Sequence, residues 1–176
     1  MARSKARFRL LSNDAVQGLV LAAQPERVTE GFLFFQRTYE VDRFEEFLDS
    51  ETRACAGEET SPLVASGFVL SSVQLVLAET HGVDLEGLQH RELAASLEGP
   101  GRLVLVFARR HARAVLERWP EDSPSVTDIW AVLRDHGFAE TQRGYADELA
   151  TAMATLRGWL EAVDWDHTGV LWTSEA

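Results

Sequence analysis

The sequence has little of what small proteins use to form disulfides, bind metals through thiolates or cross membranes. Cys55 is the only cysteine among 176 residues, which excludes an intrachain disulfide and a thiolate cluster within one chain. No stretch reaches the roughly 18 uncharged apolar residues of a membrane-spanning helix. The N-terminus is basic, but polar residues interrupt the apolar run that a signal peptide needs. We therefore expect a cytoplasmic protein that contacts no membrane.

The sequence motifs of common enzyme families are also missing. There is no Gly-rich dinucleotide motif, no P-loop, no G-x-S-x-G, no C-x-x-C and no H-E-x-x-H. These absences argue against most nucleotide-dependent and hydrolytic enzymes, although a site assembled from scattered residues would leave no such trace. We therefore expect no cofactor, no metal and no catalysis.

Basic residues are outnumbered: 17 Lys and Arg stand against 28 Asp and Glu, for a formal net charge of −11. Such a charge repels bare nucleic acid at long range and favours the approach of basic partners. We therefore predict no nucleic-acid binding and a basic protein as the partner.

The composition is that of one globular domain. An apolar share of 45% and a charged share of 26% are ordinary for such domains, and a chain of this length can bury one sizeable core. We predict a single domain over residues 1–176, with a disordered basic arm over residues 1–6. The sequence does not distinguish a monomer from a homodimer.

The strongest pattern is an amphipathic segment over residues 145–163. Apolar side chains recur there at spacings of three and four, which predicts a helix with one continuously buried face. These side chains are Leu149, Met153, Leu156, Leu160 and Val163, with Trp159 beside them. A short apolar run over residues 169–173 follows and predicts a final strand.

The rest of the chain alternates between segments with the periodicity of strands and segments with the periodicity of helices. We predict strands over residues 7–11, 31–41 and 102–107, the first at a sheet edge, and helices over residues 12–23, from residue 42, and over 70–80, 85–97, 109–119 and 123–136. Leu103, Phe107 and His111 also fall at helical spacing, so residues 102–119 could instead form one helix. The expected fold class is α+β, with several helices packed on a small mixed or antiparallel sheet.

The segment from residue 40 to residue 59 holds eight carboxylates against two arginines. Three of them lie on the outer face of the helix predicted from residue 42, and two follow in a loop. They are Glu45, Glu46, Asp49, Glu58 and Glu59. Such a surface suits the docking of a basic protein, although an ordinary solvated helix face would look the same.

All five tryptophans lie in the last third of the chain, which suggests an alternative site for a small ligand. Its candidate residues are Arg109, His111, Arg113, Trp165, His167 and Trp172. Core packing or a solvated basic face would explain most of them equally well.

Other candidates have simpler structural explanations. Cys55 has no motif around it and is expected at a helix end that disfavours the thiolate. His81 and His136 each precede a glycine at a predicted helix end, where histidine stabilises the helix dipole. The segment 164–167 is dense in Asp and His, but a polar turn explains it better than a metal site.

These observations support one leading hypothesis and two alternatives. The first is a non-catalytic acidic interaction protein, an inhibitor or immunity-type protein that masks a basic partner protein. The second is a small-molecule-binding protein, or an enzyme with a dispersed site, in the tryptophan-rich C-terminal third. The third is a homo-oligomer whose apolar strands pair between chains.

Overall fold

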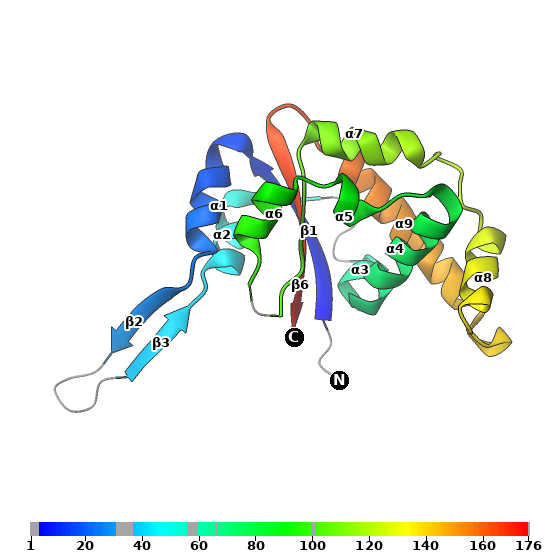
Figure 1. The fold of residues 1–176 in the computed structure, drawn as a ribbon, viewed down its shortest axis with the longest axis horizontal. Helices are drawn as coiled ribbons and strands as arrows, with labels where there is room; N and C mark the ends of the chain where they lie inside the picture. The colour runs from blue at the N-terminus through cyan, green and yellow to red at the C-terminus, as the bar shows by residue number, and fades with distance from the viewer. Residues whose placement is uncertain (1–3, 31–36, 56–59, 66, 100, 176) are drawn as a thin grey trace.

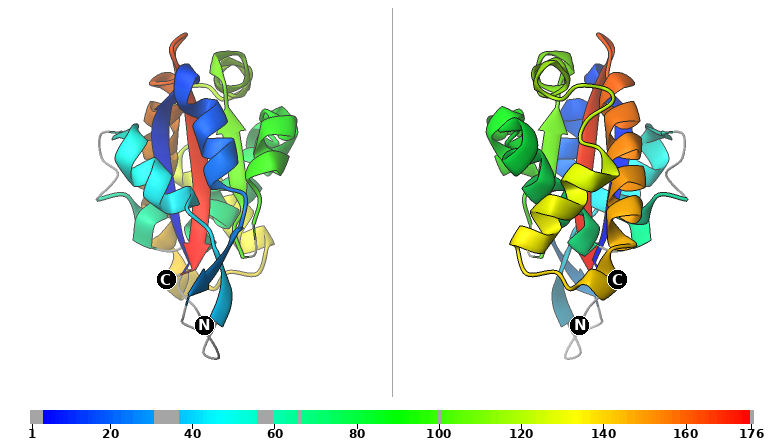
Figure 2. Two further views of the ribbon diagram at one scale, coloured as in Figure 1. Left: turned by 90° about the vertical axis from the view of Figure 1, so that its left-hand side faces the viewer. Right: turned by 90° about the vertical axis from the view of Figure 1, so that its right-hand side faces the viewer.

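The computed structural model describes residues 4–30, 37–55, 60–65, 67–99 and 101–175. It is an α+β domain in which helices cover both faces of a four-stranded antiparallel sheet of order β4-β1-β6-β5 (Figures 1 and 2). The strands are β1 (Ser4–Ser12), β2 (Glu26–Glu30), β3 (Arg37–Val41), β4 (Thr52–Ala54), β5 (Val104–Phe107) and β6 (His167–Glu175). The expected fold class is confirmed.

The helices of the described residues vary widely in length. They are α1 (Val16–Ala22), α2 (Phe44–Glu51), α3 (Pro62–Ala65), α4 (Gly67–His81), α5 (Leu85–Leu88), α6 (Arg91–Leu97), α7 (Arg109–Arg118), α8 (Val126–Asp135) and α9 (Tyr145–Glu161). Two short 3-10 turns, Asn13–Ala15 and Glu140–Gln142, precede α1 and α9. None of the helices in the described ranges is both long and apolar enough to cross a membrane.

The alternation of side chains along the strands divides the core into two layers. Phe8 and Leu171 belong to the larger layer, which also contains the buried faces of α4, α7, α8 and α9. Leu11, Val170 and Trp172 belong to the smaller layer under α1, α2 and α6. Figure 2 shows α1 and α2 on one face of the sheet and α9 on the other.

The amphipathic helix predicted over residues 145–163 is α9, and its apolar face is buried as expected. Every apolar side chain expected on the buried face of α9 is buried, and β6 pairs with β1 on one side and β5 on the other. Trp159 stacks on Phe8 of β1, with ring centroids 5.4 Å apart. The final helix and strand therefore hold both the sheet and its larger core layer.

The structure corrects several local expectations. The strand predicted at a sheet edge is β1, which is interior because it pairs with both β4 and β6. Residues 4–6, expected in a disordered arm, lie in β1 and pair with residues 173–175; residues 1–3 lie outside the described part. The strand expected over residues 31–41 is described only as β3, and its aromatic half, residues 31–36, lies outside the described residues.

Two further boundaries differ. The helix predicted over 85–97 is two helices, α5 and α6, separated by Gln89 and His90. The backbone N–H of His90 donates to the Val106 carbonyl, and the Gln89 side chain accepts from the Val106 N–H, so this break covers the outer edge of β5. The helix predicted over residues 123–136 begins later, because Ser125 forms a capping box with Asp128 at the start of α8.

The strand predicted over residues 102–107 is present as β5, over Val104–Phe107, and is not part of a longer helix. β5 is fully buried, and Ala108 in extended conformation separates it from α7. Figure 1 shows a second structural feature that the sequence did not predict: the ribbon of β2 and β3 extends away from the body at the foot of α1 and α2. Its strands pair with each other, and the cross-strand pairs include Thr29 with Thr38.

Candidate functional site

Helix α2 presents the predicted acidic residues on the outer side of the smaller core layer. Phe44 and Leu48 point inward and are fully buried, which turns Glu46 and Asp49 to solvent and leaves Glu45 half-buried. The helix begins where the Asp42 carboxylate accepts from the Phe44 backbone N–H at 2.9 Å. Glu58 and Glu59 lie outside the described residues.

The carboxylates of α2 differ in their surroundings. Asp49 lies 3.9 Å from Arg7 and 3.7 Å from Arg9, both on β1, so its charge is partly balanced within the chain. Within the described ranges, Glu45 and Glu46 form no ion pair. The net negative charge of this face therefore rests on Glu45 and Glu46 rather than on Asp49.

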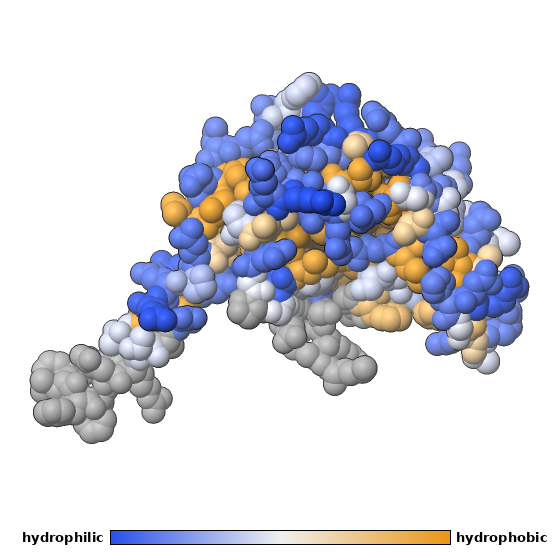
Figure 3. All heavy atoms as spheres, in the orientation of Figure 1, coloured by the Kyte–Doolittle hydropathy of each residue, from blue (hydrophilic) through white to orange (hydrophobic). Residues whose placement is uncertain are grey.

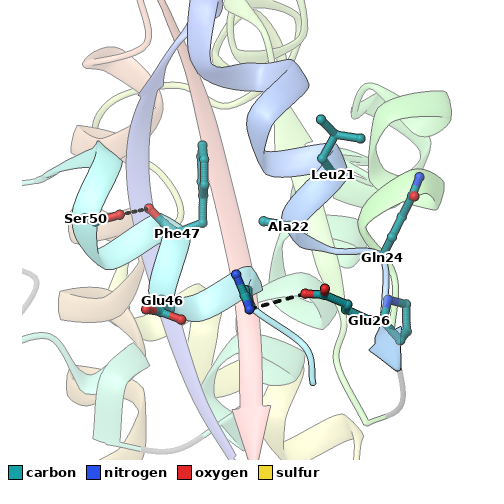
Figure 4. A pocket seen from close by; sticks show the side chains of 9 residues that line it. Leu21, Ala22, Gln24, Glu26, Glu46, Phe47 and Ser50 are labelled. Carbon is teal, nitrogen blue, oxygen red and sulfur yellow. Dashed lines mark hydrogen bonds and ion pairs between the residues drawn. The ribbon is translucent and has the colours of Figure 1, made fainter. Parts of the chain in front are cut away.

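A groove of about 600 Å³ lies between α1 and α2, at the foot of the β2–β3 ribbon (Figure 4). We call it the α1–α2 groove; it is lined by Leu21, Ala22, Gln24, Pro25, Glu26, Arg43, Glu46, Phe47 and Ser50. Leu21 is 62% exposed, and apolar surface is visible over α1 in Figure 3. Arg43 pairs with Glu26 across the groove at 3.3 Å. A groove that combines the apolar side chains of Leu21 and Phe47 with the carboxylates of Glu26 and Glu46 can accept an apolar side chain flanked by cations.

No local pattern in the sequence predicts this groove, because its walls come from two different helices. Phe47 is only half-buried and forms part of the groove. Gly18 of α1 lies so close to the Phe47 ring that an added Cβ would be 2.8 Å from it. Leu21 lies off the buried face of α1 and is exposed. A leucine at this position was the signal in the sequence that could have indicated a groove.

The C-terminal candidates do not converge on one pocket. The Arg109 guanidinium stacks over the Trp165 ring at 3.8 Å, and Trp165 is 76% exposed on the turn between α9 and β6. Trp172 is fully buried in the smaller core layer and packs edge-on against Phe44. Arg113 is exposed on α7. Trp172 is therefore a core residue, while Arg109 and Trp165 share one surface.

His111 points to a different place, the covered edge of β5. Its ring lies 5.1 Å from that of His90, its Nε2 accepts from Arg110 at 3.2 Å, and its Nδ1 is buried with no hydrogen-bond partner among the described residues. His90 Nδ1 accepts from the Leu93 N–H and caps α6. In these two hydrogen bonds a ring nitrogen of each histidine accepts, which requires that the imidazole ring be neutral.

This arrangement predicts a loss of stability on acidification. Burial, followed by the charge of Arg110, holds the pKa of His111 below its ordinary value. The unfolded chain therefore binds the proton more tightly than the folded protein does. The contribution of neutral His111 to the free energy of unfolding is complete above a pH of about 6.5 and is lost as the pH falls below it. We expect the thermal midpoint of the wild type to fall between neutral pH and about pH 5 more steeply than that of His111→Gln. Equal slopes would show that His111 does not contribute.

The turn that carries Trp165 is held by Asp164 and Asn13. Asp164 Oδ1 accepts from His167 Nδ1 at 2.8 Å and from the backbone N–H groups of Asp166 and His167, and the first of these bonds does most to lower the pKa of Asp164. The Asn13 side chain donates to the Trp165 carbonyl and accepts from Thr168. The segment is an ordered polar turn, and the described residues contain no group of three or more metal-ligand side chains.

A second groove lies on the larger-core side of the sheet, between α9 and the edge strand β4. We call it the α9–β4 groove; it encloses about 340 Å³ and is lined by Leu10, Arg53, Ala54, Cys55, Gly158, Trp159, Ala162, Asp164 and His167. Cys55 follows a strand and not the helix end that we expected. Burial raises the pKa of its thiol, against the opposing effect of Arg9 and Arg53, so the protonated thiol dominates at neutral pH.

Comparisons with protein-family models, with curated proteins and with solved structures find no match to this chain.

Proposed function

We propose that this protein is a non-catalytic binding protein that masks a basic surface of a partner protein, as inhibitor and immunity proteins do. One observation carries the proposal: the α1–α2 groove combines apolar side chains with the carboxylate of Glu46, which forms no ion pair within the described ranges. Leu21 and Phe47 form the apolar part of the α1–α2 groove, and Glu46 is one of its lining residues; Glu45 precedes Glu46 on α2 and does not line the groove.

The two components would act on different stages of binding. Glu45 and Glu46, on a protein of net charge −11, would attract and orient a basic partner and raise the association rate. Burying one large apolar side chain of the partner against Leu21 would then contribute about 1.5–3 kcal/mol and slow dissociation. Interfaces typically depend on a few such buried anchors.

The ion pair in the groove fits the same partner. Arg43 balances only one of the two carboxylates that line the groove, Glu26 and Glu46, so the groove stays negative. An arginine of the partner could compete with Arg43 for Glu26 or bind Glu46 directly. The preferred partner segment is therefore an apolar side chain flanked by Arg or Lys.

The proposal is tested by affinity capture from the native host with two variants, Glu45→Gln/Glu46→Gln and Leu21→Ser. We expect the wild type to capture a basic protein, and we expect both variants to lose it. The captured protein is then purified, and its dissociation constant is measured at low and high salt. Loss of both carboxylates should weaken binding about tenfold or more at low salt, with a smaller difference at high salt.

A charge-matched control separates this surface from net charge alone. Glu121 and Asp122 are exposed on the connection between α7 and α8, far from the groove (Figure 1). The Glu121→Gln/Asp122→Asn variant changes the net charge equally and should bind like the wild type. Equal capture by the wild type and the Glu45→Gln/Glu46→Gln variant would overturn the proposal.

A further inference from the structure

Helix α9 carries a glycine where packing does not require one. Gly158 lies inside the helix and faces the α9–β4 groove, and a Cβ built on it meets no atom within 4 Å. Alanine would fit there and would favour the helix, because glycine in a helix interior is destabilising. The open space over Gly158 allows another molecule to approach the helix backbone closely.

The bottom of the groove is apolar and buried. Leu10 and Trp159 line it and are 7% and 1% exposed. Trp159 stacks one face of its ring on Phe8, which holds the ring in place as part of the groove lining. The opening beside Gly158 and Ala162 therefore suits a flat apolar group such as a single aromatic ring.

The two ends of the groove differ in charge and chemistry. Arg53, exposed at one end, forms no ion pair with any described residue. At the other end His167 Nδ1 is engaged by Asp164, so Nε2 of the neutral ring is left as an acceptor. In the sheet, Arg53 of β4 pairs with Leu10 of β1, and Leu10 pairs with Gly169 of β6. Gly169 lies two residues after His167 on the same strand. Strand spacing then separates the Cα atoms of Arg53 and His167 by roughly 12 Å.

We propose that the α9–β4 groove binds a small aromatic carboxylate. The carboxylate would pair with Arg53, the ring would lie over Gly158 against Leu10, and a hydroxyl or amine at the far end would donate to His167. This site lies on the opposite face of the sheet from the α1–α2 groove, and the inference does not depend on the proposed protein binding.

Cys55 provides the measurement, because it lines the groove and is the only thiol of the chain. The probe is 4-hydroxybenzoate, whose carboxylate and hydroxyl lie at opposite ends of one ring. At constant ionic strength and a pH of about 8, millimolar 4-hydroxybenzoate should slow the reaction of Cys55 with DTNB in a saturable way. Phenol, which lacks the carboxylate, should protect much less.

Matched variants locate the binding. Gly158→Leu fills the groove and should abolish protection, whereas Arg53→Gln should weaken binding about tenfold. Gly158→Ala should raise the thermal midpoint, which shows that this position accepts a side chain without loss of the fold. Saturable protection that Gly158→Leu abolishes supports the proposal. No protection of the wild type, or equal protection of Gly158→Leu, overturns it.

Discussion

Replacing Trp159 by alanine is expected to lower the free energy of unfolding by about 3–5 kcal/mol. Trp159 is 1% exposed, and its ring stacks at 15° on Phe8 of β1. The substitution removes the largest side chain on the buried face of α9 and leaves a cavity between this helix and the sheet. Denaturant unfolding monitored by circular dichroism measures the loss.

Trp165→Ala provides the matched control. The same atoms are removed, but Trp165 is 76% exposed and its ring contacts the Arg109 guanidinium. An exposed cation–π contact contributes about 0.5–1 kcal/mol, so the loss should stay within that range. Comparable losses for the two tryptophans would contradict the central position of α9.

Replacing Arg102 by alanine is expected to lower the free energy of unfolding by about 2–4 kcal/mol, because it removes several contacts of one nearly buried cation. The Arg102 side chain is 8% exposed and pairs with Asp42 at 2.7 Å. Two of its nitrogens also donate to the Leu97 carbonyl at the end of α6, and its guanidinium lies 3.8 Å over the Phe44 ring. Arg102 thus joins α6, the start of α2 and the base of the β2–β3 ribbon.

The conservative variant distinguishes this geometry from charge alone. Arg102→Lys keeps the charge but cannot reach Asp42 and the Leu97 carbonyl together, so it should recover only a part of the loss. Arg27→Ala breaks the ion pair between Arg27 and Glu40, in which the Arg27 side chain is 79% exposed. This substitution should change the free energy of unfolding by less than about 0.5 kcal/mol. Equal effects of Arg102→Ala and Arg27→Ala would show that the Arg102 contacts do not stabilise the fold.

The elements that were predicted well depend on local patterns. The buried face of α9 is set by a periodicity within one helix, and the strand over residues 102–107 is a short apolar run bounded by glycine and a helix start. The outward position of Glu46 and Asp49 follows from the inward position of Phe44 and Leu48. Such features need no knowledge of distant residues.

The features that were missed depend on contacts between distant segments. Arg102 meets Asp42 across 60 positions in the sequence, and the backbone of His90 completes the edge of β5. The α9–β4 groove is assembled from Cys55, Gly158 and His167, which lie on three separate parts of the chain. No local periodicity records that these parts converge, so sequence analysis had no basis for predicting this site.

The central claim is that a basic partner protein binds the α1–α2 groove, and site-specific photo-crosslinking in the native host tests it most directly. A benzophenone amino acid replaces Leu21 in the groove or Glu121 on the distant connection between α7 and α8. We predict a crosslink from position 21 to one basic protein, lost in the Glu45→Gln/Glu46→Gln background, and none to that protein from position 121. Absence of any crosslink at position 21, or the same products from both positions, would contradict the account.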